Sequence, residues 1–276
     1  ETGHFAMPWV RLHAVKDYIG MANLLAEFPR VRQVINFVPS LVRQIQEYLA
    51  GQTDLALIVS RIPADSLTAA HVNFILDTFF MANWERMVNP HPRYRQLLAR
   101  RDFSRKTAAA AARKFSADDL RDLQVWFNLA WFHPTVVEKD HDLQALIHKD
   151  RGFTEQDKNL VLDKQLKIMA DIIPLHRRLA EAGQLELTTT PFFHPIIPLL
   201  CDASKARVAI PGLPLPEPML TSPEDAAAQI QNAVACHHQV FGARPRGMWP
   251  SEGSVSDDAA ALFAQAGIDW IDTAEV

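Results

Sequence analysis

One short segment in the last third of the chain combines a carboxylate with a large aromatic side chain. Residues 248–253, Met-Trp-Pro-Ser-Glu-Gly, overlap and follow a short predicted strand. In a parallel β/α barrel, the carboxyl ends of the strands and the loops after them form the active site. We therefore expect Glu252 to point into the mouth of such a barrel, with the Trp249 indole beside it as a flat surface for stacking. On position alone, an exposed loop acid explains Glu252 equally well.

A second group of polar and aromatic residues surrounds a strand predicted at 185–189. Hydroxyl, carboxylate and imidazole groups among aromatic rings suit a ligand with many hydroxyl groups. The alternative is a capped strand end with a buried, hydrogen-bonded histidine. The group comprises Glu186, Thr188, Thr189, Thr190, Phe192, Phe193 and His194.

Histidines are otherwise scattered, and no metal-binding pattern is present. His13 lies in a polar and aromatic stretch at 9–18, but a single histidine is more often structural than catalytic. His237 and His238 are neighbours on a predicted helix, so they face different directions and cannot chelate one metal together. The chain contains no His-Glu-x-x-His pair, no Gly-x-Ser-x-Gly elbow and no Walker loop. We expect no cofactor and no metal, although a metal site built from distant histidines stays open.

Composition limits the class of protein. The chain has 276 residues, of which 48% are hydrophobic and 22% charged, and this is the composition of a globular protein. No apolar run approaches the roughly 20 residues of a membrane-spanning helix, so no membrane partner is expected. A net charge of −4 gives no reason to expect a nucleic-acid partner. Only two cysteines, Cys201 and Cys236, fit a reducing compartment, and we therefore expect a cytoplasmic protein.

The elements that must position these residues follow an α/β pattern. Residues 5–50 alternate strand and helix, with a buried strand predicted at 34–38 and a helix from Pro39 to about Ala50. Residues 54–182 are predicted to be almost entirely helical. Ser116 and Thr154 begin two of these helices, because each is followed by acidic residues in a capping-box pattern.

Strands return in the last third of the chain. Strands are predicted at 185–189, 247–249 and 268–271, with helices at 222–242 and 256–267 between them. This βαβ order indicates a parallel sheet or barrel, in which the helical block is an insertion. Asp272 falls at the last strand, where we expect its side chain to face the barrel wall or the helices.

Several segments, taken in order, resemble glycoside hydrolase family 57, and in particular its amylase- and amylopullulanase-like branch. Residues 248–252 are similar to the family's third motif, whose glutamate is the catalytic nucleophile. Residues 7–18 resemble the sequence after the family's N-terminal His-Gln-Pro motif. Residues 183–186 resemble the second motif, and residues 189–196 resemble its extension in this branch. Residues 123–132 resemble a helical region of the same branch.

The resemblance implies a fold and a reaction. The implied fold is an α/β incomplete (β/α)7-type barrel over 1–276, truncated here, with 54–182 as a mostly helical insertion. The implied reaction is retaining hydrolysis or transglycosylation of α-glucans such as starch, glycogen or maltodextrin, through a covalent glycosyl ester. Glu252 is the implied nucleophile, and the implied substrate-binding residues are His13, Glu186, His194 and Trp249.

Two expected motifs fall outside the sequence, and two other functions stay open. The resemblance places the His-Gln-Pro motif before Glu1 and the general-acid aspartate beyond Val276. Asp272 and Glu275 are nearby acids, but the family pattern does not assign the acid to them. One alternative is a carbohydrate-binding barrel without catalysis, which would keep the aromatic surface and lack the acid. The other is a metal-dependent hydrolase similar to polysaccharide deacetylases.

Overall fold

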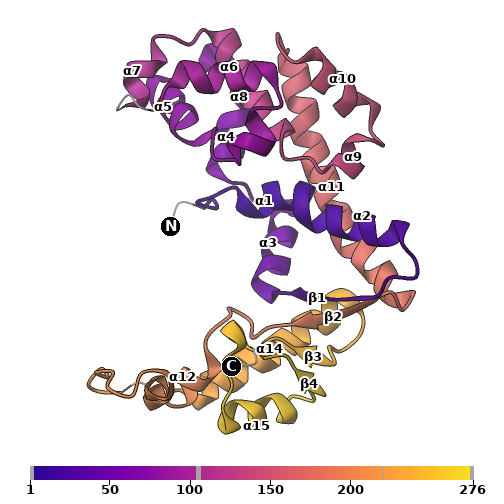
Figure 1. Ribbon diagram of the computed structural model, residues 1–276, viewed down its shortest axis with the longest axis vertical. Helices are drawn as coiled ribbons and strands as arrows, with labels where there is room; N and C mark the ends of the chain where they lie inside the picture. The colour runs from indigo at the N-terminus through magenta and orange to yellow at the C-terminus, as the bar shows by residue number, and fades with distance from the viewer. Residues whose placement is uncertain (1–2, 104–106, 220, 274–276) are drawn as a thin grey trace. The chain divides into compact units, whose positions relative to one another are not determined.

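The computed structural model describes residues 3–103, 107–219 and 221–273 (Figure 1). The chain forms two compact units, a helical unit (Glu1–Glu27 and Glu47–Ile172) and a sheet unit (Phe28–Gln46 and Ile173–Val276). Most of the described residues are helical, and the strands form one parallel sheet, so the fold is α/β.

The sheet unit contains four parallel strands in the order β1-β2-β3-β4. Strands β1 and β2 pair along their whole length, from Gln33 opposite Leu185 to Phe37 opposite Thr189. Because all four strands run in the same direction, their carboxyl ends meet at one edge of the sheet. The strands are β1 (Gln33–Phe37), β2 (Leu185–Thr189), β3 (Gly247–Met248) and β4 (Trp270–Ile271).

Helices pack on one face of this sheet and form the core of the sheet unit. Ile230 and Val234 of α14 lie in one buried cluster with Met248 of β3 and Phe263 of α15. Fully burying an aliphatic or aromatic side chain of this size contributes roughly 1.5–3 kcal/mol. The helices of the unit and its connections are α3 (Pro39–Leu49), α12 (Ile197–Cys201), α13 (Ala206–Ala209), α14 (Pro223–Phe241) and α15 (Asp257–Gln265).

The helical unit has its own core around α8. Trp126 and Phe127 of α8 are almost fully buried, and Phe127 stacks on Phe79 with ring centroids 4.2 Å apart. The described helices are α1 (Trp9–His13), a π-helical turn (Ala14–Tyr18), α2 (Ile19–Glu27), α4 (Leu55–Arg61), α5 (Ala69–Thr78), a second π-helical turn (Trp84–Val88), α6 (Pro92–Arg101), α7 (Ala108–Ala112), α8 (Ala117–Leu129), α9 (Pro134–Val137), α10 (His141–Lys149) and α11 (Glu155–Glu181).

A buried polar network ties the first helix of this unit to three others. Arg11 of α1 is fully buried, and its guanidinium donates to Asp54, Asn128 and Gln165. Asp54 is also fully buried, caps α4 by accepting from the Leu57 N–H at 2.7 Å, and accepts from the Tyr48 hydroxyl at 2.9 Å. The Asp54 carboxylate therefore accepts hydrogen bonds from the Arg11 guanidinium, the Leu57 N–H and the Tyr48 hydroxyl.

The predicted helix starts are confirmed, two of them with a capping box and a third without a side-chain cap. Ser116 and Asp119 form a reciprocal capping box, and so do Thr154 and Asp157. Ser222 precedes Pro223 at the start of α14 as expected, but its side chain makes no capping hydrogen bond. Its backbone N–H donates to the Leu200 carbonyl instead, which fixes Ser222 away from the capping geometry.

The prediction of a buried first strand is wrong. Only Phe37 of β1 is buried, and the Val34 side chain is 56% exposed. In the described sheet β1 lies at an edge and pairs with β2 alone, so one side of the strand has no neighbour.

Among the described helices, none has both the length and the apolar character that crossing a membrane would require.

Candidate active site

The ends of β2 and β3 lie side by side and bring two candidate residues together. Thr189 pairs with Met248, and the Trp249 N–H donates to the Thr189 carbonyl at 2.9 Å. The loops that leave these two strands therefore start at the same edge of the sheet. One loop carries His194 and the other Glu252, and His194 Nε2 lies 3.6 Å from Glu252 Oε1.

Both residues of this pair adopt the left-handed backbone conformation. His194 has φ 60° and Glu252 has φ 55°, in the region that residues other than glycine seldom enter. Such a conformation costs about 1–3 kcal/mol and is found more often at active sites and ligand-binding sites than elsewhere. Their side chains stay accessible, 34% exposed for His194 and 73% for Glu252. The pair is therefore held in an unusual geometry while it remains open to a ligand.

Local sequence explains how Glu252 reaches this conformation. Pro250, with φ −62°, enters a tight turn in which the Gly253 N–H donates to the Pro250 carbonyl at 2.8 Å. Gly253 itself has φ 66°, which costs a glycine little. The Thr273 hydroxyl donates to the Gly253 carbonyl at 2.7 Å and fixes the far side of the turn. A matching turn precedes His194, whose N–H donates to the Pro191 carbonyl at 2.9 Å.

Two buried polar atoms next to this pair lack partners in the described part of the chain. They are His194 Nδ1 and the hydroxyl oxygen of Ser251, a residue that is almost fully buried. Buried polar groups are normally hydrogen-bonded, so two such atoms beside an accessible carboxylate are a feature that needs an explanation. Ser251 carried no sequence signal of its own, because a serine in a proline–glycine turn usually serves the turn.

Three threonines at the end of β2 act differently from the sequence-based expectation: Thr188 and Thr189 are its last two residues, and Thr190 follows it. All three are buried. The Thr189 hydroxyl donates to the Phe37 carbonyl at 3.2 Å, and the Thr190 hydroxyl donates to the Pro191 carbonyl at 3.1 Å. These two hydroxyls therefore hydrogen-bond to backbone carbonyls at the strand ends.

Trp249 and Trp270 lie on the face of the sheet opposite the helices. Met248 belongs to the core beneath α14, and side chains alternate along a strand, so Gly247 and Trp249 face the other way. The Trp270 ring packs directly on Gly247, where an added Cβ would lie 2.3 Å from ring carbon Cε2. The Trp249 side chain is half-buried on this face.

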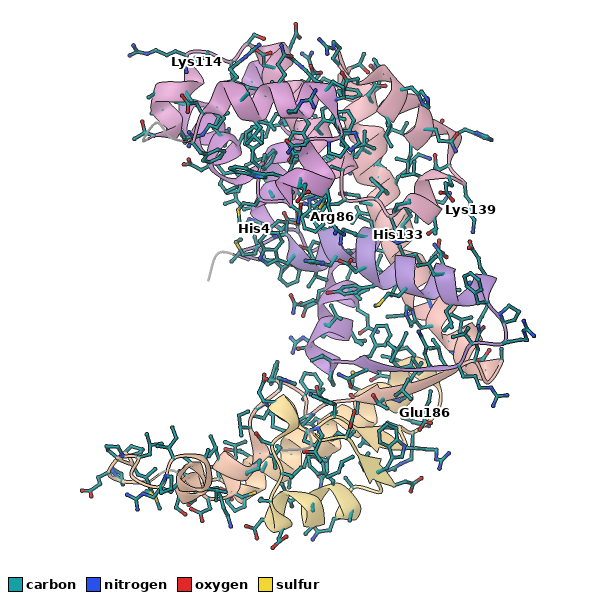
Figure 2. The ribbon with its side chains drawn as sticks, viewed as in Figure 1. His4, Arg86, Lys114, His133, Lys139 and Glu186 are labelled. Atoms are coloured by element: carbon teal, nitrogen blue, oxygen red, sulfur yellow. The ribbon has the colours of Figure 1, made fainter. Side chains whose placement is uncertain are left out.

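Glu186 is held by a structural partner near the amino end of β2. Its Oε1 accepts from Trp270 Nε1 at 3.0 Å, and Figure 2 shows it on the strand. Glu186 lies four residues before Thr190, which is roughly 13 Å along an extended strand. It lines a separate cavity of about 450 Å³ with Arg32 and Arg246. The structure does not bring Glu186 into the group formed by His194 and Glu252.

His13 belongs to the helical unit, whereas the other four candidates belong to the sheet unit. It is the last residue of α1, and its Nδ1 hydrogen-bonds to the Asp17 carboxylate. Its ring meets Trp131 edge-on at 5.2 Å and stacks with Tyr18 at 6.3 Å. Burial raises the pKa of Asp17, but hydrogen bonds from Lys16 and His13 outweigh it and hold that pKa below its usual value.

Asp272 follows the last strand, whose predicted end at Ile271 is confirmed. Strand β4 ends at Ile271, so Asp272 lies just beyond the strand and not within it. Its N–H donates to the Met248 carbonyl at 3.4 Å, and alternation directs its side chain to the face of Trp270. Asp272 is therefore a second acid at the edge that carries Glu252. Glu275 lies outside the described residues.

No set of metal ligands converges in the described ranges. Among these residues, no group of three or more His, Cys, Asp or Glu side chains is arranged to hold a metal ion. Both cysteines, Cys201 and Cys236, are free thiols.

The sequence comparison identifies the family. The sequence model of glycosyl hydrolase family 57 matches residues 1–275, so this chain belongs to that family. No curated protein sequence matches the chain.

Three solved structures are similar to this chain at low identity. An α-amylase from Thermotoga maritima has 13% identity and a TM-score of 0.43, with 96% of this chain and 34% of that chain covered. A family 57 branching enzyme from Thermococcus kodakaraensis has 16% identity and a TM-score of 0.44, with 98% and 36% covered. A branching enzyme of the same type from Pyrococcus horikoshii has 16% identity and a TM-score of 0.44, with 98% and 38% covered. The chain thus spans little more than a third of the length of these structures.

Proposed function

We propose that this chain is part of a retaining glycosidase or transglycosylase that acts on α-glucans, with Glu252 as its nucleophile. Family membership supports glycosidic chemistry over a deacetylase-like hydrolysis. The observation that carries the proposal is the accessible Glu252 carboxylate, held on left-handed backbone beside His194 at the carboxyl ends of two parallel strands. The α-glucan substrate rests on the resemblance of residues 248–252 and 189–196 to the family's motifs.

The reaction proceeds in two displacements. The Glu252 carboxylate attacks the anomeric carbon, the bond to the leaving oxygen breaks, and a glycosyl ester forms. A general acid protonates the leaving oxygen and then activates the incoming water or sugar hydroxyl. We assign that acid to the later motif of the family, beyond Val276. Water gives hydrolysis, and a sugar hydroxyl gives transfer.

His194 and Trp249 complete the proposed site. We assign to His194 Nε2, 3.6 Å from Glu252 Oε1, the role of orienting the Glu252 carboxylate. His194 Nδ1 and the Ser251 hydroxyl are buried behind this pair and do not reach a bound sugar. Trp249 provides a ring face for stacking. We also retain substrate binding by Glu186 and His13 as proposals, each tested by its alanine variant.

The proposal extends to the fold and the location. The four parallel strands would belong to an incomplete (β/α)7 barrel, with 1–276 as part of its catalytic domain and 54–182 as its helical insertion. The free state of Cys201 and Cys236 supports a cytoplasmic location.

Substituting Trp249 should weaken substrate binding without unfolding the protein. Trp249→Ala should lower the affinity for maltoheptaose by about 1–3 kcal/mol, the usual effect of removing a buried aromatic anchor. Titration calorimetry measures this affinity, and circular dichroism checks the fold. Unchanged affinity in a folded variant would show that Trp249 lies outside the site.

The reaction type has its own test. The full-length protein is incubated with amylose, and the products are followed by proton NMR during the first minutes. A retaining enzyme releases the α anomer first, and β anomer appears only as mutarotation proceeds. New glycosidic linkages would identify transfer. Initial release of the β anomer would refute the double displacement, and binding of amylose without any product would favour the non-catalytic carbohydrate-binding barrel.

A further inference from the structure

A cavity of about 460 Å³ lies in the sheet unit, apart from the residues assigned to the reaction. It is formed by α3, by α14 and by the loop that follows β2. Residues of α14 at positions 229, 232, 236 and 239 share one face of that helix, because they are spaced by three and four. The lining residues that matter here are Gln46, Phe193, Gln229, Asn232, Cys236 and Gln239.

The cavity is lined by carboxamides and contains no acid. It contains four side-chain carboxamides and no carboxylate among its lining residues. A carboxamide both donates and accepts hydrogen bonds, and so does a sugar hydroxyl, so the two groups match in either direction. The lining has no acid to hold a cation, and its one basic residue, Arg43, stands among four carboxamides, so a ligand rich in hydroxyl groups is the best match.

An exposed aromatic ring completes the cavity. Phe193 is 62% exposed, an unusual position for a phenylalanine, yet its backbone is fixed by donation from its N–H to Gln229 Oε1 at 2.9 Å. Its ring meets Phe192 at 4.8 Å and 68°, which holds the Phe193 ring from one side. A fixed, accessible ring bordered by carboxamides is the arrangement that binds the apolar face of a sugar while its hydroxyls are hydrogen-bonded.

We propose that this cavity is an accessory binding site for a neutral α-glucan segment, separate from the reaction centre. The identity of the sugar rests on the proposed function. Phe193 immediately precedes His194, so a glucan bound here is tethered close to Glu252 along the loop after β2. Binding one polymer at two places raises its effective concentration at the second, which favours long glucans over short ones.

The rate at which Cys236 is alkylated reports whether the cavity is occupied, because Cys236 lines the cavity. Alkylation by iodoacetamide is followed by mass spectrometry of the Cys236 peptide in the full-length Glu252→Gln protein, where turnover does not consume the ligand. Burial raises the pKa of the Cys236 thiol, so labelling is run at alkaline pH. Maltoheptaose at ten times its Kd leaves about one site in eleven open and should slow labelling about tenfold. Cys201, which does not line the cavity, is the internal control and should keep its rate.

A matched pair of variants tests the aromatic ring independently. Phe193→Ala should reduce retardation in a native gel containing glycogen, with affinity lowered at least about fivefold. Phe28 is the control, since it is a phenylalanine of the same unit with 59% exposure and lies outside the cavity lining. Phe28→Ala should migrate like the parent protein.

The outcomes separate this proposal from the assignment of Glu252. Unchanged Cys236 labelling with maltoheptaose, or equal retardation of the Phe193→Ala and Phe28→Ala variants, would overturn the accessory site whatever Glu252 does. Protection by inorganic phosphate in place of maltoheptaose would overturn it as well, and would assign the cavity to an anion held by Arg43. Protection by maltoheptaose in a protein whose Glu252→Ala variant keeps full turnover would support the site and refute the nucleophile.

Discussion

Replacing Glu252 with alanine should lower the turnover of amylose by the full-length protein by about a thousandfold or more, as loss of a nucleophile usually does. Without the carboxylate no glycosyl ester forms, and the barrier returns toward that of direct attack by water. The measurement is kcat for amylose at saturating substrate. The fold should be unaffected, because the Glu252 side chain is 73% exposed and, among the described residues, contacts the side chain of His194 alone.

Two other acids of the sheet unit are the controls for Glu252. Glu186→Ala should act through binding and through the loss of its hydrogen bond from Trp270, so we expect a change in KM more than in kcat. Asp272→Asn removes the second acid at the same edge, and it should keep kcat within about tenfold of the parent if the general acid lies in a later motif. Near-normal turnover in Glu252→Ala, or a loss as large in Glu186→Ala, would show that the nucleophile is assigned to the wrong residue. A loss as large in Asp272→Asn would instead make Asp272 the general acid.

Arg11→Met should destabilise the helical unit by about 3–5 kcal/mol, because it leaves a buried carboxylate without its counter-charge. Arg11 and Asp54 are both fully buried, with Nε and Oδ2 2.7 Å apart. Burial and the Asp54 charge raise the pKa of Tyr48, which therefore stays protonated and donates to Asp54, but one neutral hydrogen bond cannot replace the guanidinium. Urea denaturation followed by tryptophan fluorescence measures the effect.

An exposed arginine of the same unit provides the matched control. Among the described residues, Arg95→Met removes a single 3.3 Å hydrogen bond, to the Asn89 carbonyl at the surface, and its effect should stay within about 0.5 kcal/mol. The double variant Arg11→Met with Asp54→Asn should lose less than the two single changes added together, since the partners are coupled. An Arg11→Met protein as stable as the Arg95→Met protein would mean that the buried network contributes nothing measurable.

The strands and helix ends near the candidate site were predictable because their signals are local. Strand β2 occupies 185–189 as predicted, and the capping boxes at Ser116 and Thr154 are confirmed. A short apolar run between turn residues, or a hydroxyl residue three before an acid, determines the nearby backbone directly. The family resemblance, which rests on such ordered local segments, is confirmed over nearly the whole chain.

Features that depend on the order of strands were not predictable. The contact between His194 and Glu252 requires β2 and β3 to be neighbours, and the bond from Trp270 to Glu186 requires a third strand beside them. The exposure of β1 follows from its edge position in the same way.

The buried network around Arg11 is the strongest case of this kind. Its partners Asp54, Asn128 and Gln165 lie 43, 117 and 154 residues away along the chain. An arginine inside a short polar and aromatic segment carries no local sign that it will be fully buried. The four side chains meet only when the helices pack, so no pattern along the sequence predicts their contacts.

Rescue by azide tests the role of Glu252 most directly. The full-length Glu252→Ala protein is incubated with an activated aryl α-glucoside, whose phenolate leaves without help from an acid, and with sodium azide. Azide should occupy the space of the missing carboxylate and attack the anomeric carbon once, from the nucleophile's side. The account predicts partial recovery of turnover and a glycosyl azide of β configuration, with no such rescue in Glu186→Ala. Rescue of Glu186→Ala in place of Glu252→Ala, or an azide product of α configuration, would contradict it.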